Sequence, residues 1–192
     1  VESLTNEGSI FFFRYIFFAM GFWYLLDKNP HLSKCLLNIL VLCILIVGFD
    51  GVIQYFFEVN IFGYEKYNKY RLTGLFSDEP IIGRYIAYLS LFTFALIFQN
   101  YKETGKMILL SISFLVMCEL IVLLSGERTP FFYTSLFLIL IILFLPNYKV
   151  YRISGIVIII LLIVGIFQFN PNAKVRMVDI TIAQINESQI PY

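Results

Sequence analysis

Long continuous runs of apolar residues dominate the chain, and short polar segments separate them. Six such runs can be drawn, at 10–26, 36–57, 81–98, 107–124, 131–145 and 150–169. A helix needs about 20 mainly apolar residues to cross a bilayer, and inside hydrocarbon only helices or closed barrels satisfy the backbone. Because the runs lack the two-residue alternation of barrel strands, the pattern predicts an all-α, polytopic transmembrane bundle of about six spans.

Composition supports the same class of protein. Of the 192 residues, 59% are hydrophobic and 14% are charged, whereas soluble domains are nearer half apolar and a quarter charged. We expect membrane lipids to surround the bundle, and we expect no nucleic-acid partner. The chain starts at Val1 without a basic n-region, which argues against a signal peptide. We interpret it as part of a longer protein, with a bundle over 1–169 and the start of an extracytoplasmic loop over 170–192.

The basic residues suggest an orientation. Segments 27–35, 99–106 and 146–152 share one predicted face and carry six Lys and Arg, while the opposite face carries seven. The counts do not decide, but the first set lies in short loops with few acids, where the positive-inside rule applies best. We therefore predict that these segments face the cytoplasm and that 58–80, 125–130 and the region from 170 onward lie outside.

The predicted outer loop 58–80 holds candidate chemistry beside an alternative structural role. Arg71 precedes Gly74 by three residues, and a glycine there allows a tight turn or the close approach of a ligand. Asp78 and Glu79 precede the third run, where acids complement a helix dipole. Either acid is also a candidate to accept a proton from a sugar hydroxyl.

A second outer connection reads Ser125-Gly126-Glu127-Arg128-Thr129-Pro130. The Thr-Pro pair suits an N-cap followed by the first helical position. Arg128 would then lie beside a helix N-terminus, where a phosphate meets both free amides and a guanidinium fork. The alternative is that Arg128 only anchors the hairpin to lipid headgroups.

Some polar residues fall within the predicted spans or away from the outer face. The four ionisable residues within spans are Arg14, Asp50, Arg84 and Glu119. Buried charges in a membrane pair with one another or mark a functional pathway, so we consider Arg14–Asp50 and Arg84–Glu119 pairs as a structural explanation. His31 is expected in a cytoplasmic loop. The three cysteines lie in apolar runs without metal-ligand spacing, so no metal site is expected.

Three stretches resemble the O-antigen ligase and polymerase superfamily. RLTGLFSDEPIIGRYIAYLSLF is similar to that family's Arg-x-x-Gly stretch, which leads through a polar segment with Pro into a span. LLSGERTPFFYTSLFLILIIL is similar to its second motif at a span end, and the last run leads into a polar loop with Arg176. The motifs are short and degenerate. The resemblance covers roughly the chain from Arg71 onward.

The resemblance implies a polytopic inner-membrane glycosyltransferase that needs no metal or other cofactor. Its donor would be a polyprenyl-pyrophosphate-linked glycan, transferred outside the cytoplasm to lipid A core, another glycan or a protein. The family pattern puts arginines on the pyrophosphate, which here are Arg71, Arg128 and Arg176. The candidate bases are Asp78, Glu79 and Glu127, and the supporting residues would be Gly74, Arg84 and Ser125. The functional histidine of the ligases' large loop has no counterpart here, so ligase and polymerase stay open.

Two other functions fit the same pattern. A transporter or flippase for lipid-linked sugars would also have many spans and an outer polar cavity, although no internal repeat of the kind found in transporters is visible. A non-catalytic membrane scaffold is the third. Loss of the arginines would change transfer chemistry in an enzyme, but only assembly or abundance in a scaffold.

Overall fold

The computed structural model describes most of the chain. It covers residues 13–102 and 104–144, and after them 153–154, 157–158, 160–161, 163–165, 168 and 174–183. The helices follow one another as α2 (Phe13–Lys28), α3 (Pro30–Phe57), α4 (Ile82–Asn100), α5 (Gly105–Leu124) and α6 (Arg128–Phe144), with short helices η2 (Gly74–Phe76) and η3 (Val175–Asp179). Within these residues only isolated bridges occur in place of strands, which confirms the all-α prediction there.

Three helices are long and apolar enough to cross a membrane, namely α3, α4 and α5. This is fewer than the six predicted spans. Helix α2 has 16 residues and α6 has 17, which is short of the usual span length, and most of 150–169 lies outside the described residues. Many large apolar side chains on α2 and α3 point outward, such as Phe17 at 73% and Phe49 at 64% exposed. Such surfaces suit a membrane protein.

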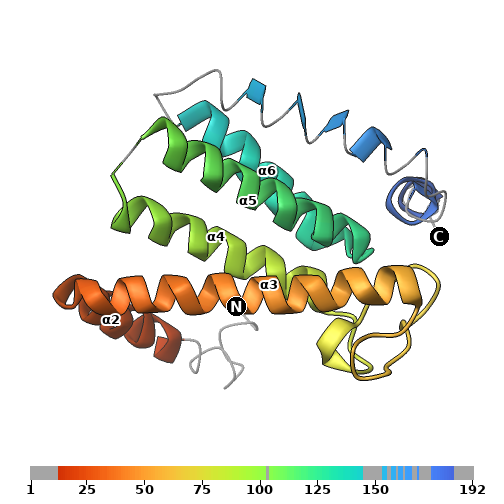
Figure 1. Ribbon diagram of the computed structural model, residues 1–192, viewed down its shortest axis with the longest axis horizontal. Helices are drawn as coiled ribbons and strands as arrows, with labels where there is room; N and C mark the ends of the chain where they lie inside the picture. The colour runs from red at the N-terminus through yellow and green to blue at the C-terminus, as the bar shows by residue number, and fades with distance from the viewer. Residues whose placement is uncertain are drawn as a thin grey trace, which may run out of the picture.

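The helices run back and forth past one another. Figure 1 shows α3 lying lengthwise, α4 and α5 inclined across it, and the segment between α3 and α4 folded at the far end of α3. Helix α2 packs against the start of α3 and the second half of α4, where Leu26, Leu37 and Leu96 form a small buried cluster. The main core joins α3, α4 and α5 through Ile44, Val47, Ile82, Ile86, Ala87, Cys118, Ile121 and Val122, together with Leu72.

Two glycines set how closely the helices approach. A Cβ atom at Gly48 would lie 2.7 Å from Ile121 Cδ1, and one at Gly51 would lie 2.5 Å from Ile82 Cδ1. Small residues let membrane helices pack backbone to backbone. Helix α3 is therefore pressed against α5 and the start of α4 in its second half, next to the loop.

Two predicted boundaries were wrong. Helix α3 begins at Pro30 rather than at residue 36, so only Asn29 separates it from α2 and His31 is helical. Proline suits the first turn because the first amides of a helix need no intrahelical acceptor. Helix α6 begins at Arg128, so Thr129 is not its N-cap and Pro130 lies within its first turn, where proline is again accepted. The Phe131 amide donates to the Glu127 carbonyl at 3.3 Å.

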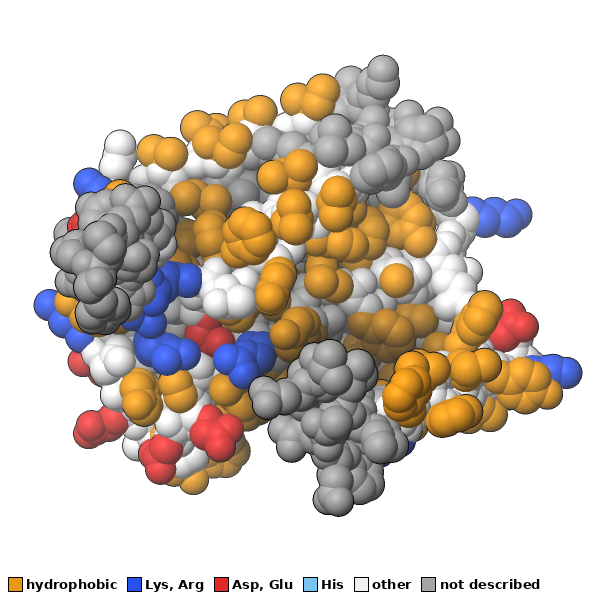
Figure 2. All heavy atoms as spheres, turned by 180° about the vertical axis from the view of Figure 1, so that it is seen from behind, with side chains coloured by type: hydrophobic (Ala, Val, Ile, Leu, Met, Phe, Trp, Pro, Cys, Tyr) orange, Lys and Arg blue, Asp and Glu red, His pale blue; other side chains and the backbone are white. Residues whose placement is uncertain are grey.

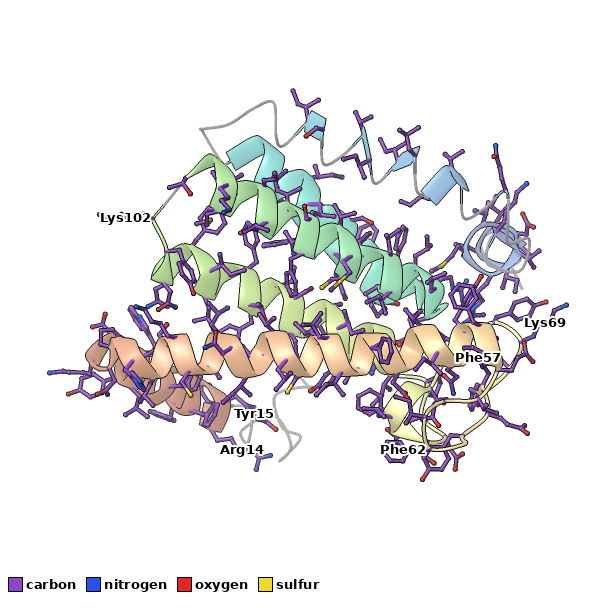
Figure 3. All side chains as sticks on the ribbon, viewed as in Figure 1. Arg14, Tyr15, Phe57, Phe62, Lys69 and Lys102 are labelled. Carbon is purple, nitrogen blue, oxygen red and sulfur yellow. The ribbon has the colours of Figure 1, made fainter. Side chains whose placement is uncertain are left out.

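The two ion pairs considered for the intramembrane charges do not form. Arg14 donates to the hydroxyl of Tyr15 at 3.1 Å, and both lie on α2 away from the rest of the bundle (Figure 3). Asp50 accepts from the loop instead, and Glu119 accepts from Ser135 at 2.5 Å. The one ion pair among the described residues joins Lys66 to Glu58 at 3.2 Å.

Candidate functional site

The segment between α3 and α4 folds around Gln54, a fully buried residue of α3. Its Oε1 accepts from the amides of Thr73 and Gly74 at 2.9 and 2.8 Å. Its Nε2 faces the carbonyls of Tyr64 and Glu65, both at 3.2 Å, and the Thr73 hydroxyl at 2.9 Å. One side chain thus joins two distant parts of the segment and holds both to the end of α3.

Asp50, one helical turn before Gln54, completes this framework. Its Oδ1 accepts from the Ile61 amide at 3.0 Å. Asn60 lies beside it, donating to the Gly74 carbonyl at 2.7 Å and accepting from the amides of Phe62 and Tyr64. These buried polar side chains satisfy partly buried backbone groups of the loop, and they fix the position from which Arg71 extends.

The turn after α5 crosses directly over this segment. The Leu72 amide donates to the Ser125 carbonyl at 3.2 Å. Gly126 has a φ of 74°, and a Cβ atom there would lie 1.9 Å from the Tyr70 carbonyl oxygen. Only glycine adopts this conformation at that spacing without strain. The crossing brings the start of α6 next to Arg71.

Glu127 ties the same turn to the start of α4. Its Oε1 accepts from the amides of Gly83 at 2.7 Å and Arg84 at 3.3 Å. A carboxylate at a helix N-terminus satisfies free amides and complements the dipole. Burial raises the pKa of the Glu127 carboxyl, although these amides and the charges of Arg71 and Arg84 act in the opposite direction.

Three arginines from separate parts of the chain meet beside this turn. Arg128 donates to the Thr181 hydroxyl at 3.0 Å, and Arg176 Nε donates to the Gly126 carbonyl at 3.3 Å. Burial, followed by the positive charges of Arg128 and Arg71, lowers the pKa of Arg176. Each arginine is partly buried, so the three like charges are held together with reduced access to water. Figure 2 shows basic side chains gathered at this end of the molecule, beside the wide apolar surface of the helices.

Arg71 is held from one side only. A terminal nitrogen donates to the Pro80 carbonyl at 3.0 Å, and its guanidinium lies 6.0 Å from the Tyr67 ring centre. Its Nε is buried and meets no acceptor among the described residues. An unsatisfied buried donor costs about 1–3 kcal/mol, which an incoming anionic oxygen would offset.

The space between Arg71 and Arg176 is small. The cleft there is lined by Tyr55, Lys66, Lys69, Tyr70, Arg71, Leu72, Leu123, Leu124, Gly126, Arg176 and Met177, and its volume is about 30 Å³. A single water needs about 10–15 Å³ by this measure. In this conformation the cleft admits a water or two and excludes a diphosphate.

The other residues predicted for the site have varied positions. Asp78 and Glu79 are exposed at the turn after η2, and neither forms an ion pair with the arginines in the described part of the chain. The side chain of Arg84 is exposed. Ser125 is buried, with its Oγ donating to the Val122 carbonyl at 2.7 Å. Gly74 is buried with a φ of 55°, so it serves the turn.

The sequence interpretation missed Gln54, Asn60 and Thr181 as residues that build the site. Asp50 and Gln54 are four residues apart, the spacing that places two side chains on one helix face. That spacing could have indicated a polar patch on α3 facing the loop. Thr181 gave no comparable signal.

The three helices that are long and apolar enough to cross a bilayer indicate a helical membrane protein. Comparison with protein-family models, with curated proteins and with solved structures finds no match.

Replacing Glu127 tests its role as the cap of α4. In Glu127→Ala the amides of Gly83 and Arg84 lose their acceptor, and we expect a loss of about 1–3 kcal/mol in the free energy of unfolding. Glu127→Gln keeps an acceptor oxygen and should lose less. Denaturant titration in mixed micelles measures both. Glu79→Ala, at an exposed position in the neighbouring turn, is the control, and a loss there equal to that of Glu127→Ala would contradict the capping role.

Proposed function

We propose that the protein is a membrane glycosyltransferase that uses a polyprenyl-pyrophosphate-linked glycan as donor, of the O-antigen ligase or polymerase type. Its acceptor would be a glycan, lipid A core or a protein. The reaction would take place at the extracytoplasmic face of a bacterial inner membrane. The observation that carries the proposal is the meeting of Arg71, Arg128 and Arg176 at one end of the helices.

The arginine cluster suits a diphosphate better than a monovalent headgroup. Three guanidinium groups close together repel one another. Burial is the main cause of the lowered pKa of Arg176, and the charges of Arg128 and Arg71 lower it further. An anion carrying two or more charges relieves it. Arginine also presents a planar fork that matches phosphate oxygens. The buried Nε of Arg71 offers one further donor.

The course of the chain supports a further crossing between α6 and η3. Helix α6 begins at Arg128 in the cluster and runs away from it for 17 residues, about 25 Å at 1.5 Å per residue. Arg176 lies back at the cluster, where it donates to the Gly126 carbonyl. The apolar stretch 150–169 lies between these two points in the sequence, and a crossing there stays a prediction from its length and hydropathy.

In the proposed reaction an acceptor hydroxyl attacks the anomeric carbon of the donor sugar. A new carbon–oxygen bond forms, the bond to the pyrophosphate oxygen breaks, and polyprenyl pyrophosphate leaves with the electron pair. Fixed positive groups stabilise the charge that develops on the leaving group. Asp78 and Glu79 are candidates to take the hydroxyl proton, because both are exposed in the turn between η2 and α4. The Glu127 carboxylate is held by two amides, and its proposed role becomes positioning.

Donor binding requires the cleft to widen. The segment that carries Arg176 and Met177 closes the cleft, and it is fastened to the turn by the Arg176–Gly126 and Arg128–Thr181 hydrogen bonds. We propose that the diphosphate replaces these two weak contacts, so that Arg128 and Arg176 turn from the protein to the ligand.

Lysine substitutions at the arginines test the proposal. We expect Arg71→Lys and Arg128→Lys to weaken binding of polyprenyl pyrophosphate about tenfold each, since lysine keeps the charge but loses the fork. Binding to the full chain in nanodiscs is measured by isothermal titration, with polyprenyl monophosphate as the comparison ligand. Arg14→Lys, remote on α2, is the matched control.

Three outcomes separate the alternatives. Wild-type affinity in both lysine variants would mean that Arg71 and Arg128 do not bind the pyrophosphate. Weakened binding with parallel loss of glycan transfer to an added acceptor supports the transferase. Weakened binding in a protein that moves the lipid between leaflets without transfer would favour a flippase.

A further inference from the structure

A large apolar groove lies at the end of the bundle opposite the arginines. Its volume is about 690 Å³, within the range of about 300–1,000 Å³ typical of ligand pockets. One wall is the first half of α3, the floor is the end of α4, and the other wall is the first half of α5. The lining residues are Leu37, Asn38, Val41, Leu42, Leu45, Ile97, Tyr101, Thr104, Lys106, Met107, Leu110, Ser111 and Phe114.

The groove exists because α3 and α5 diverge. They are in close contact at Gly48, whose hydrogen faces Ile121, and Figure 1 shows them separating toward the connection between α4 and α5. No glycine lies in α3 before Gly48, so branched and long side chains keep the helices apart there. The groove opens sideways, since Leu42 is 57% and Leu110 is 62% exposed.

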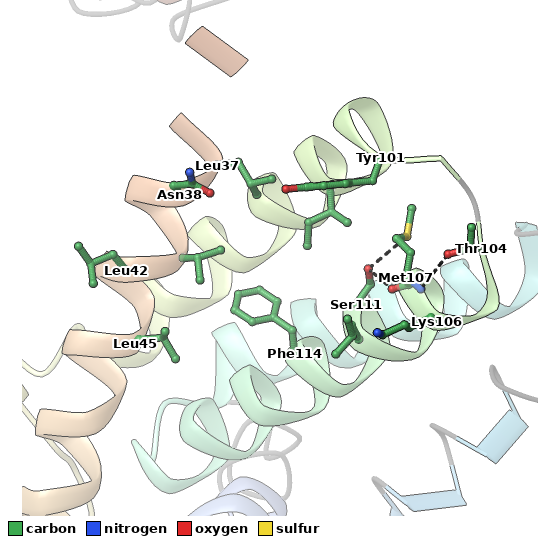
Figure 4. Close-up of a pocket in the computed structure, with 13 residues that line it drawn as sticks. Leu37, Asn38, Leu42, Leu45, Tyr101, Thr104, Lys106, Met107, Ser111 and Phe114 are labelled. Atoms are coloured by element: carbon green, nitrogen blue, oxygen red, sulfur yellow. Dashed lines mark hydrogen bonds between the residues drawn. The ribbon is translucent and has the colours of Figure 1, made fainter. Parts of the chain in front are cut away.

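The interior of the groove is apolar, and its polar groups gather at one end. Ser111 donates to the Met107 carbonyl at 2.9 Å, so its hydroxyl is satisfied within α5. Figure 4 shows Tyr101, Thr104 and Lys106 where α4 ends and α5 begins, across from Leu42 and Leu45 of α3. The Tyr101 hydroxyl points toward Leu37, and the Thr104 hydroxyl accepts from the Met107 amide at 3.2 Å. The side chain of Lys106 is exposed.

The polar end of the groove is positively charged. Lys106 lies in the first turn of α5, whose N-terminal amides add a partial positive charge. The basic residues of this end of the bundle are Lys28, Lys34, Lys102 and Lys106, against the acids Asp27 and Glu103 in the same stretches of sequence. An anion at the level of Lys106 is therefore favoured over a cation.

We propose that this groove binds one anionic phospholipid of the bilayer. An acyl chain would lie between α3 and α5, and the phosphate would lie at Lys106, beside the N-terminus of α5. The groove opens from helices α3, α4 and α5, which are long and apolar enough to cross a membrane, so its immediate surroundings are lipid chains. An apolar surface that ends at a single basic group matches the two chemical parts of such a lipid. This inference does not depend on the proposed transferase activity.

Lipid retention by the full chain tests the site. Native mass spectrometry of the protein from mixed nanodiscs would compare dioleoylphosphatidylglycerol with dioleoylphosphatidylcholine. A lysine near an anionic lipid contributes about 1 kcal/mol, so we expect about fivefold preferential retention of one phosphatidylglycerol. Lys106→Gln should abolish the preference. Lys102→Gln, four residues away, removes the same charge from an exposed position outside the groove lining and should keep most of it.

A second variant tests the chain-binding part. Leu110→Trp places a larger apolar side chain in the groove at a position that is already exposed, and it should reduce retention of both lipids. Equal retention of the two lipids with no effect of Lys106→Gln would overturn the proposal. So would a dimer mass with no bound lipid, which would mean that a second copy covers the groove.

Discussion

Gly126→Ala should cost about 2–5 kcal/mol in the free energy of unfolding and disperse the arginine cluster. A non-glycine residue at a φ of 74° is strained by about 1–2 kcal/mol. The added methyl group would also lie 1.9 Å from the Tyr70 carbonyl oxygen, so the turn must move off the loop. That movement breaks the Leu72–Ser125 and Arg176–Gly126 hydrogen bonds, each contributing about 0.5–1.5 kcal/mol.

The matched control for this variant is Gly63→Ala. Gly63 has a φ of 86°, but no atom lies within 4 Å of an added Cβ. It therefore carries the conformational penalty without the clash, and we expect a loss of only about 1–2 kcal/mol. Denaturant titration in mixed micelles measures both variants. Equal losses would show that the turn does not need to touch the loop, and the convergence of Arg71 with Arg128 would lose its structural basis.

The sequence predicted which elements form, because apolar run length is a strong signal. The runs at 36–57, 81–98 and 107–124 became α3, α4 and α5, with starts shifted by one to six residues and ends shifted by at most two. The shifts came from polar residues that helices accept in their first turns, as at Pro30 and Arg128. A hydropathy profile does not show such extensions, because the residues accepted at caps and in first turns, proline included, are also common in loops.

The sequence also pointed to Arg71, Arg128 and Arg176 as a group, but by resemblance and not by geometry. A set of buried polar contacts places them together, and no local pattern in the sequence indicates those contacts. Asn60 reaches Gly74 across fourteen residues, and Glu127 reaches Gly83 across forty-four. Contacts of that separation depend on the helix packing, so they could not be predicted before α3, α4 and α5 were placed. The same packing makes Glu127 a cap of α4, a role that the sequence did not indicate.

Gln54→Met should loosen the whole segment between α3 and α4 while α4 and α5 stay folded. Methionine matches glutamine in size but removes the acceptor of the Thr73 and Gly74 amides and the donor to Tyr64 and Glu65. Buried amides left unpaired cost about 1–3 kcal/mol each, so we expect a loss of about 2–5 kcal/mol. Because the contacts are made only to the loop, the damage should appear there first.

Limited trypsin digestion of the protein in nanodiscs measures this local loosening. Cleavage at the loop's Lys66, Lys69 and Arg71 should accelerate at least tenfold in Gln54→Met, since the open state becomes more populated. Thr73→Val removes one hydroxyl partner of Gln54 and leaves the amide contacts, so it should accelerate cleavage only a few-fold. Gln99→Met, exposed on α4, should leave the rate unchanged. An unaltered rate in Gln54→Met would mean that the loop is held from its outer side, and Arg71 would then owe its position to something other than α3.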